Sequence, residues 1–302
     1  MPDSPVVLVT GAGGNTGSRV TARLAGRGHA VRAASRAATV AHPGARPVRF
    51  DWYDEATHAP ALDGADRVYL VPPPGDADPA AVVVPFLRRA HAAGVTRVVL
   101  LGSSAIERGG PGAGRVHQFL ADEGLFDEWA VLRPSWFMQN FTADHAHARA
   151  IGTSGILTSA TGTGRVAFVD ADDIAAVAVH ALTAAAAPER ELVITGPEAL
   201  SFDEVAATVA RLTGRPVEHR PVTAERLAAH LAELGVPADF ARILAALDTA
   251  IAGGAEDRVT DTVERLTGRP PRAFADFYRA ARSGADSSRG ARSGSTVTVP
   301  SR

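Results

Sequence analysis

The sequence contains no cysteine and no lysine; all 31 of its basic residues are arginine. Without cysteine the chain can form no disulfide, present no thiol nucleophile and bind no metal through a thiolate, which agrees with a cytoplasmic protein. Without lysine it cannot form a Schiff base with a substrate. A run of about 18 apolar residues and a basic, then apolar, leader are also missing, so we expect neither a membrane span nor a signal peptide.

An excess of charge of either sign is missing too. The formal net charge is −2 over 302 residues, of which 46% are hydrophobic and 21% charged. These fractions are ordinary for a soluble globular chain with one large domain or two modest ones. The near-neutral balance indicates neither nucleic acid nor an anionic membrane as a partner.

The first half of the chain alternates between short apolar runs and helical stretches rich in Ala, Leu and Arg. This alternation predicts a parallel sheet with helices on both faces, because each parallel strand needs a crossover before the next. The predicted class is therefore α/β, with a doubly wound parallel sheet of the Rossmann type. The expected strands are 6–9, 30–34, 47–50, 67–71, 97–101 and 129–132, and the expected helices are 19–27, 80–93 and 116–123.

The second half is less regular. We expect the Rossmann domain to span 1–150 with further core strands from 164–196, a smaller, mostly helical portion to span 151–281, and a disordered tail to span 282–302. The tail is rich in Ser, Gly and Arg and has no apolar periodicity. The expected strands of this half are 164–169 and 192–194, and the expected helices are 172–183, 201–213 (with a capping box of Ser201 and Glu204), 224–233 and 239–251.

The strongest local pattern follows the first expected strand. Gly11, Gly14 and Gly17 form G-x-x-G-x-x-G between a strand and a helix. Such glycines permit a tight turn, let the backbone approach a pyrophosphate, and allow close packing of helix on strand. The first N–H groups of the helix would then face the phosphates. The pattern predicts a dinucleotide cofactor; a glycine-rich turn without a ligand is the alternative.

The end of the second expected strand bears on the choice of cofactor. For NAD, an acid at this point would bind the ribose hydroxyls, and this sequence has none there. It has Arg32, Ser35 and Arg36, which could bind a 2′-phosphate, unless the arginines are solvated surface charges. We therefore favour NADP(H) over NAD(H). Asp51, after the third expected strand, is a candidate adenine contact or the N-cap of a helix.

Five segments together resemble a known family. They are VLVTGAGGNTGSRV, RVYLVPPP, RVVLLGSSA, VLRPSWFMQNF and GRVAFVDADDIAAVAVHAL. In this order they resemble the NmrA-like, atypical short-chain dehydrogenase/reductase family over roughly residues 5–280, above all the branch with the ergot-alkaloid iminium reductases. The resemblance implies that the Rossmann domain carries NAD(P) and that the C-terminal portion closes over a substrate cleft.

The resemblance also implies roles for residues near the carboxyl ends of the expected strands, where open α/β sheets bind ligands. The pyrophosphate would be lined by Gly11, Gly14, Asn15 and Thr16, and the adenosine end by Arg36. The nicotinamide ribose would be bordered by Val71, Pro72 and Pro73, with Pro73 on the substrate side, and the nicotinamide would face Ser103 and Ser104. The pocket for the nicotinamide and the substrate would be walled by Pro134, Trp136, Phe137 and Asn140. For Trp136 and Phe137, plain core packing is the alternative.

The sequence departs from the usual short-chain reductase in its proton donor. Many such enzymes place a Tyr beside the nicotinamide and a Lys one helical turn later. This chain has no lysine, and none of its tyrosines (Tyr53, Tyr69 and Tyr278) follows the fifth expected strand at the right distance. The next helix offers His117, whose ordinary pKa near neutrality suits proton transfer. We expect His117 and Ser104 as catalytic residues; a packed or surface histidine is the alternative.

Two clusters might suggest a metal, and we expect none. Asp170, Asp172 and Asp173 lie close together, but Asp172 or Asp173 is better explained as the N-cap of the following helix. His145 and His147 are two positions apart and do not share a helix face, so we expect both at solvated helix positions.

The function that agrees with these features is that of an NAD(P)H-dependent oxidoreductase acting on a conjugated, aromatic small molecule in specialised metabolism, as a monomer or homodimer. An iminium, quinone, enone or quinone methide has an electrophilic carbon, so hydride addition needs little help from an acid. Two alternatives stay open: a non-enzymatic NAD(P) sensor or regulator, and a cofactor-retaining enzyme of isomerisation, elimination or coupling.

Overall fold

The computed structural model describes residues 5–39, 42–76, 78–142, 145–188 and 191–293. Its main sheet has seven parallel strands in the order β3-β2-β1-β4-β5-β6-β9, which is the predicted Rossmann-like α/β fold. The strand order reverses between β1 and β4, the point where such sheets open a crevice for a ligand. The strands are β1 (Val7–Val9), β2 (Val31–Ser35), β3 (Ala45–Arg49), β4 (Arg67–Leu70), β5 (Arg97–Leu101), β6 (Glu128–Pro134) and β9 (Glu191–Ile194).

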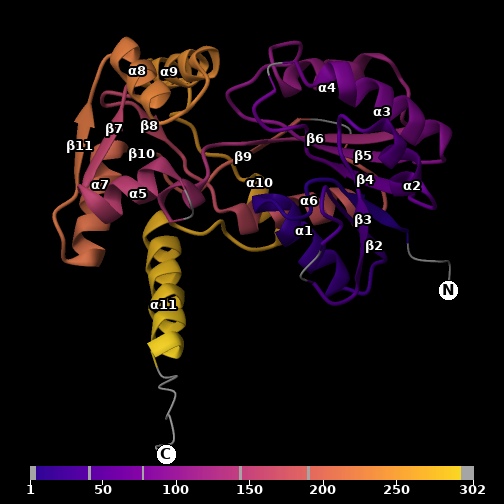
Figure 1. Cartoon of the computed structure of the whole chain (residues 1–302), viewed down its shortest axis with the longest axis horizontal. Helices are drawn as coiled ribbons and strands as arrows, with labels where there is room; N and C mark the ends of the chain where they lie inside the picture. The colour runs from indigo at the N-terminus through magenta and orange to yellow at the C-terminus, as the bar shows by residue number, and fades with distance from the viewer. Residues whose placement is uncertain (1–4, 40–41, 77, 143–144, 189–190, 294–302) are drawn as a thin grey trace, which may run out of the picture.

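Helices cover both faces of this sheet (Figure 1). Successive side chains of a strand point to opposite faces, so Val7 and Val9 join one core cluster while Leu8 joins the other. No helix among the described residues is long and apolar enough to cross a bilayer. The helices of one face are α1 (Asn15–Ala25), α6 (Ala171–Thr183) and α10 (Thr262–Thr267), and those of the other are α2 (His58–Leu62), α3 (Ala80–Ala92) and α4 (Ala113–Asp122).

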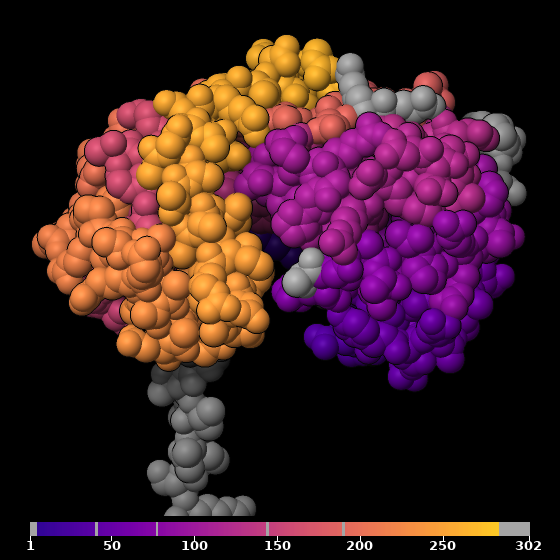
Figure 2. Space-filling model, turned by 90° about the horizontal axis from the view of Figure 1, so that it is seen from above, coloured from indigo at the N-terminus to yellow at the C-terminus, as the bar shows by residue number. Residues whose placement is uncertain are grey.

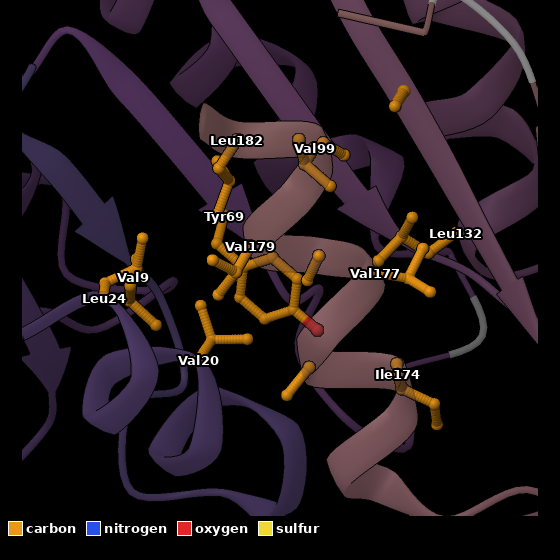
Figure 3. Close-up of a cluster of buried hydrophobic side chains, with 14 of the residues drawn as sticks. Val9, Val20, Leu24, Tyr69, Val99, Leu132, Ile174, Val177, Val179 and Leu182 are labelled. Atoms are coloured by element: carbon orange, nitrogen blue, oxygen red, sulfur yellow. The ribbon is translucent and has the colours of Figure 1, made fainter. Parts of the chain in front are cut away.

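The first core cluster joins the two halves of the sequence. Figure 3 shows Tyr69 of β4 among apolar side chains of α1 and α6, with no exposed surface. Val20 and Leu24 lie on the inner face of α1, and Val177 lies on α6, which is more than 150 positions further along the chain. Each fully buried Val or Leu contributes about 1.5–3 kcal/mol to folding, so α6 is an integral layer of the Rossmann domain.

The remaining elements form a second lobe with its own core. The third cluster gathers aromatic rings, among them Phe141, Phe168, Phe202 and Phe274, which pack edge-to-face or tilted at 5.2–6.1 Å. The lobe consists of α5 (Ala146–Thr153), β7 (Ile156–Ser159), β8 (Arg165–Val166), β10 (Leu200–Ser201), α7 (Phe202–Thr213), β11 (Glu218–Pro221), α8 (Ala224–Glu233), α9 (Ala238–Ala252) and α11 (Phe274–Ser293).

Two expectations about this lobe are wrong. The expected strand 164–169 is only the two residues of β8, which pair with β10 outside the main sheet; of the strands expected from 164–196, β9 alone joins that sheet. The segment expected as a disordered tail begins inside α11, which continues to Ser293, while 294–302 lie outside the described residues. Phe274 anchors the start of this helix in the core of the second lobe.

Candidate cofactor and substrate site

The glycine-rich turn connects the central strand β1 to α1. Gly11 has a φ of +62°, in the left-handed region that favours glycine, and its carbonyl accepts a hydrogen bond from the Gly14 N–H at 2.8 Å. A Cβ on Gly17 would lie 2.2 Å from the Gly11 carbonyl oxygen, so the turn and the helix can meet only through a glycine. This geometry agrees with the roles expected of the first and third glycines.

The start of α1 is open to a ligand. Gly14 is its N-cap and provides no side-chain cap, and the first turn contains no acid. Gly13, Gly14 and Asn15 are exposed, whereas Thr16 is buried and would contribute its N–H group. Free N–H groups and the positive end of the helix dipole suit a pyrophosphate, so these residues fit a dinucleotide cofactor. Figure 2 shows a cleft between the two lobes with the early, indigo part of the chain at its floor.

Thr10 fastens the two strands that border this crevice. It is fully buried, and its hydroxyl accepts a hydrogen bond from the Val71 N–H at 2.7 Å and lies 3.2 Å from the Tyr69 carbonyl oxygen. Val71 and Pro72 are partly buried, and Pro73 is buried. The segment after β4 is therefore held against the glycine turn, and its place beside a nicotinamide ribose stays a prediction.

At the adenosine end, the structure separates the two candidate arginines. Arg32 is 8% exposed, and its guanidinium donates to the carbonyl oxygens of Ala61 (3.0 Å) and Pro60, so the idea that it binds a 2′-phosphate is wrong. The cause is the alternation of side chains along β2, which points this residue under α2. Arg36 follows the strand and is exposed, and Ser35 is partly buried. Of these two arginines, Arg36 is the one whose side chain is open to a ligand.

Asp51 lies at the end of the segment after β3 and is partly buried. Its carboxylate accepts a hydrogen bond from the Tyr53 N–H at 3.1 Å, which leaves its second oxygen able to contact an adenine. It is not the helix N-cap considered as the alternative. Asp54 caps the short 3₁₀ helix Glu55–Thr57 by accepting from the Ala56 N–H.

The two serines after β5 have different surroundings. Ser103 is partly buried, and its hydroxyl oxygen accepts the Ala105 N–H at 3.3 Å, so its own hydrogen remains available for a ligand. Ser104 is 2% exposed and donates its hydroxyl hydrogen to Glu256 at 2.7 Å. Ser103 is therefore the better placed of the two to touch a cofactor or substrate, and Ser104, which we expected to be catalytic, lies behind it.

The segment after β6 forms the wall between the lobes. Pro134 is buried, and Trp136, Phe137 and Asn140 are partly buried. Trp136 packs against the core of the second lobe, whereas Phe137 packs against the core of the Rossmann domain. Both rings thus contribute to core packing and still present surface where the lobes meet.

His117 does not reach the crevice. It is 3% exposed on the buried face of α4, its Nε2 lies 3.4 Å from a Glu191 oxygen, and its ring is 6.4 Å from that of Trp129. Burial lowers the pKa of His117, so the ring is neutral at physiological pH. Arg133 binds both Glu191 and the Ser104 carbonyl oxygen, which ties this buried cluster to the end of β5. The alternative of a packed histidine describes this environment, and we drop the catalytic assignment.

The three tyrosines all lie elsewhere. Tyr69 is enclosed in the first core cluster, where burial raises its pKa. Tyr278 belongs to the core of the second lobe, and the exposed Tyr53 donates its hydroxyl to Asp76 at 2.7 Å.

The acidic cluster at the start of α6 binds arginines. Asp170 is the N-cap and accepts the Asp172 N–H at 3.0 Å, so the expectation that Asp172 or Asp173 caps the helix is wrong. Asp170 also pairs with Arg272 at 2.9 Å, and Asp173 with Arg269 at 2.8 Å. These pairs dock the segment before α11 on the Rossmann domain. Within the described residues, no group of three or more candidate ligands could hold a metal.

His145 and His147 are partly buried, and neither is the fully solvated helix position that we expected. The His145 ring accepts the His147 N–H at 3.2 Å and so caps α5. The partly buried His147 ring stacks on Phe141 at 5.5 Å and meets Phe202 edge-on. Desolvation lowers the pKa of His147 to about 3.

Glu256 is the residue of this site that the sequence did not indicate. It lies in GGAEDRVT, between α9 and α10, a polar stretch that resembles an ordinary surface loop. In the structure it is 3% exposed and contacts serines at the ends of β5 and β6. No local pattern reveals this contact, because it depends on how the two lobes meet.

The fold and the glycine cradle define a Rossmann-type dinucleotide-binding protein, and similarity to known proteins agrees. Residues 11–185 match the family described as NAD(P)H-binding. The chain belongs to this family, and it is an oxidoreductase.

Two relatives match nearly the whole chain. It is 43% identical over 280 residues to the uncharacterized oxidoreductase YesF of Bacillus subtilis, covering 93% of this chain and 96% of that protein. It is 39% identical over 279 residues to the agroclavine dehydrogenase of Claviceps fusiformis, covering 90% and 95%.

Solved structures share the fold. The triphenylmethane reductase of Citrobacter sp. superposes with a TM-score of 0.75 at 22% identity, covering 91% of this chain and 99% of that one. An NADPH-dependent quinone oxidoreductase of Escherichia coli, solved with NADPH, gives a TM-score of 0.73 at 24% identity, covering 90% and 98%.

Proposed function

We propose that this protein is an NADPH-dependent reductase of conjugated, aromatic small molecules, such as iminium ions, quinones, enones or quinone methides. One observation carries the proposal: the end of β5 offers a serine hydroxyl, and no tyrosine lies beside it in the described residues. The sequence has no lysine to complete the usual pair. A substrate reduced here must therefore accept hydride with little acid assistance.

The bound cofactor would supply the hydride, and the protein would supply position and a dry site. The glycine turn and the N–H groups of α1 hold the pyrophosphate, and Arg36 holds the 2′-phosphate. Ser103 donates a hydrogen bond to the carboxamide or to a substrate heteroatom. Trp136 and Phe137 offer flat apolar surface against which a conjugated ring packs. Holding two reactants in the reactive geometry can lower the activation free energy by about 7–11 kcal/mol. Hydride transfer to an electrophilic carbon therefore does not need an acid supplied by the protein.

The names of the relatives support this class of substrate. Agroclavine, quinones and triphenylmethane dyes are the compounds named with them. For NADPH over NADH, the support is the exposed Arg36 and the lack of an acid at the end of β2. A cytoplasmic location, specialised metabolism and a monomeric or homodimeric state belong to the same proposal.

The test is oxidation of NADPH by the purified protein against a panel of iminium ions, quinones, enones and cationic dyes. We expect turnover with at least one class and weaker turnover with NADH. Product that forms equally with NADPH and NADP⁺ would instead favour the non-redox alternative. Tight cofactor binding without turnover of any panel member would favour the sensor.

A further inference from the structure

The segment between α9 and α10 crosses from the second lobe to the carboxyl edge of the main sheet. Thr260 fastens it to the end of β9: its N–H donates to the Thr195 hydroxyl at 2.9 Å, and its hydroxyl donates to the Val193 carbonyl at 2.9 Å. Arg258 donates to the Ser104 carbonyl at 3.1 Å. The segment therefore acts as a clasp over the ends of β5 and β9, and we call residues 253–261 the clasp.

Glu256 is the part of the clasp that reaches deepest. Its carboxylate accepts the Ser104 hydroxyl at 2.7 Å and lies 3.5 Å from the Ser135 hydroxyl, so it joins the ends of two neighbouring strands. Arg258 lies 3.7 Å from its other oxygen. Burying a carboxylate costs free energy that an apolar side chain would avoid. Packing alone therefore does not explain a glutamate at this position.

The reason is visible in the two serines. The Ser104 hydroxyl donates to Glu256, whereas the Ser103 hydroxyl accepts the Ala105 N–H and keeps its own hydrogen for another partner. Without an acceptor behind the turn, the Ser104 hydroxyl would be a buried donor with no partner, and the turn could rotate to satisfy it. We propose that Glu256 is a positioning residue: the second lobe uses it to fix the Ser103–Ser104 turn so that Ser103 faces the cofactor and substrate.

This inference rests on the proposed function, since it assigns Glu256 a part in the same site. It makes a specific demand on the chemistry of residue 256: an oxygen acceptor must be present, and a negative charge is not required. Glu256→Gln keeps an acceptor of the same shape and Glu256→Ala removes it. Thr260→Val is the matched control, because it loosens the clasp at β9 without touching Ser104.

With a substrate from the panel, we expect Glu256→Ala to lower kcat by about tenfold to a hundredfold, the usual cost of a misplaced group in an active site. The kcat of Glu256→Gln should stay within about threefold of wild type, because the neutral amide oxygen still accepts a hydrogen bond from Ser104, although a weaker one than the carboxylate accepts. The dissociation constant of NADPH should change little in both, because the pyrophosphate and adenosine contacts are far along the cofactor.

Thr260→Val should lower the melting temperature yet keep kcat. A loss of kcat in Thr260→Val equal to that in Glu256→Ala would mean that the clasp only holds the lobes together, and would overturn the proposal.

A double-mutant cycle and hydrogen exchange complete the test. If Glu256 acts through Ser104, then the double variant Ser104→Ala, Glu256→Ala should lose no more kcat than the worse of the two single variants. Additive losses of kcat would contradict the proposal.

Hydrogen exchange of the peptide spanning 102–106 needs no substrate. We expect it to quicken at least tenfold in Glu256→Ala and to stay unchanged in Glu256→Gln, and equal exchange in all variants would refute the positioning role. If wild type oxidises no NADPH with any compound, the proposed function fails, while this exchange experiment still decides the role of Glu256.

Discussion

Single residues decide how this site differs from a typical short-chain reductase. The adjacent serines after β5 have different partners: the Ser103 hydroxyl accepts the Ala105 N–H, and the Ser104 hydroxyl donates to Glu256. The sequence predicted that both serines lie at the strand end, but it could not assign their directions. The sequence also could not show that Arg32 is buried under α2 while Arg36 is exposed beyond the strand, because nothing in an arginine-rich segment distinguishes the two. Direction depends on packing partners that are distant in the chain.

The residue that selects the cofactor should be Arg36. We expect Arg36→Ala to raise the KM for NADPH by about tenfold to a hundredfold, because a charged hydrogen bond to phosphate contributes about 1.5–3 kcal/mol. The KM for NADH should hardly change, since NADH carries no 2′-phosphate. Steady-state kinetics with both cofactors measure this, with the exposed Arg215→Ala of the second lobe as the control. An unchanged ratio of the two KM values would show that Arg36 does not bind the phosphate.

At the scale of elements, local patterns predicted the Rossmann domain well. Strand and helix alternation and the glycine turn are properties of short segments, and β1, β4, β5 and their helices follow them closely. The second lobe was harder, because β8 pairs with β10 and β7 with β11 across long separations. His147 shows the same limit: its neighbours on the helix indicated solvent, while Phe141 and Phe202 enclose it from outside α5.

Two glycines of the turn, Gly17 and Gly13, should differ in how far they tolerate a larger side chain. A Cβ on Gly17 would collide with the Gly11 carbonyl oxygen at 2.2 Å, whereas a Cβ on Gly13 would meet nothing within 4 Å. We expect Gly17→Ala to destabilise the cofactor-free protein by about 1–3 kcal/mol, as overpacking does, and to weaken NADPH binding. Gly13→Ala should leave the free energy of unfolding within about 0.5 kcal/mol of wild type. Chemical denaturation of both variants checks this, and equal stabilities would show that α1 can shift away from the turn.

At the scale of the whole molecule, two lobes with separate cores meet along a cleft (Figure 2). Arginine–aspartate pairs from Arg269 and Arg272 dock one connection between the lobes, and the clasp fastens the other. The second lobe contains the desolvated ring of His147, so the stability of the protein should depend on pH.

His147 provides the test of this dependence. Its pKa of about 3 in the folded protein is below the ordinary value of 6.5, so the unfolded state binds its proton first and stability falls as pH falls below about 6.5. His147→Phe removes this penalty and keeps a ring beside Phe141. Between about pH 7.5 and about pH 5 the variant should gain about 1–2 kcal/mol relative to wild type. Thermal unfolding of wild type and variant at both pH values measures the gain. A difference that does not vary with pH would mean that His147 is not desolvated.

The central claim is that this protein transfers hydride from NADPH to a conjugated electrophile without a tyrosine–lysine pair. The most direct measurement uses NADPH carrying deuterium at both C4 positions of the nicotinamide, with the best iminium, enone or quinone methide of the panel, and mass spectrometry of the product. The account predicts one deuterium on the carbon that was electrophilic, with a rate that falls in Ser103→Ala and not in His117→Gln. Product without deuterium, or unreacted substrate beside a fully bound and intact cofactor, would contradict it.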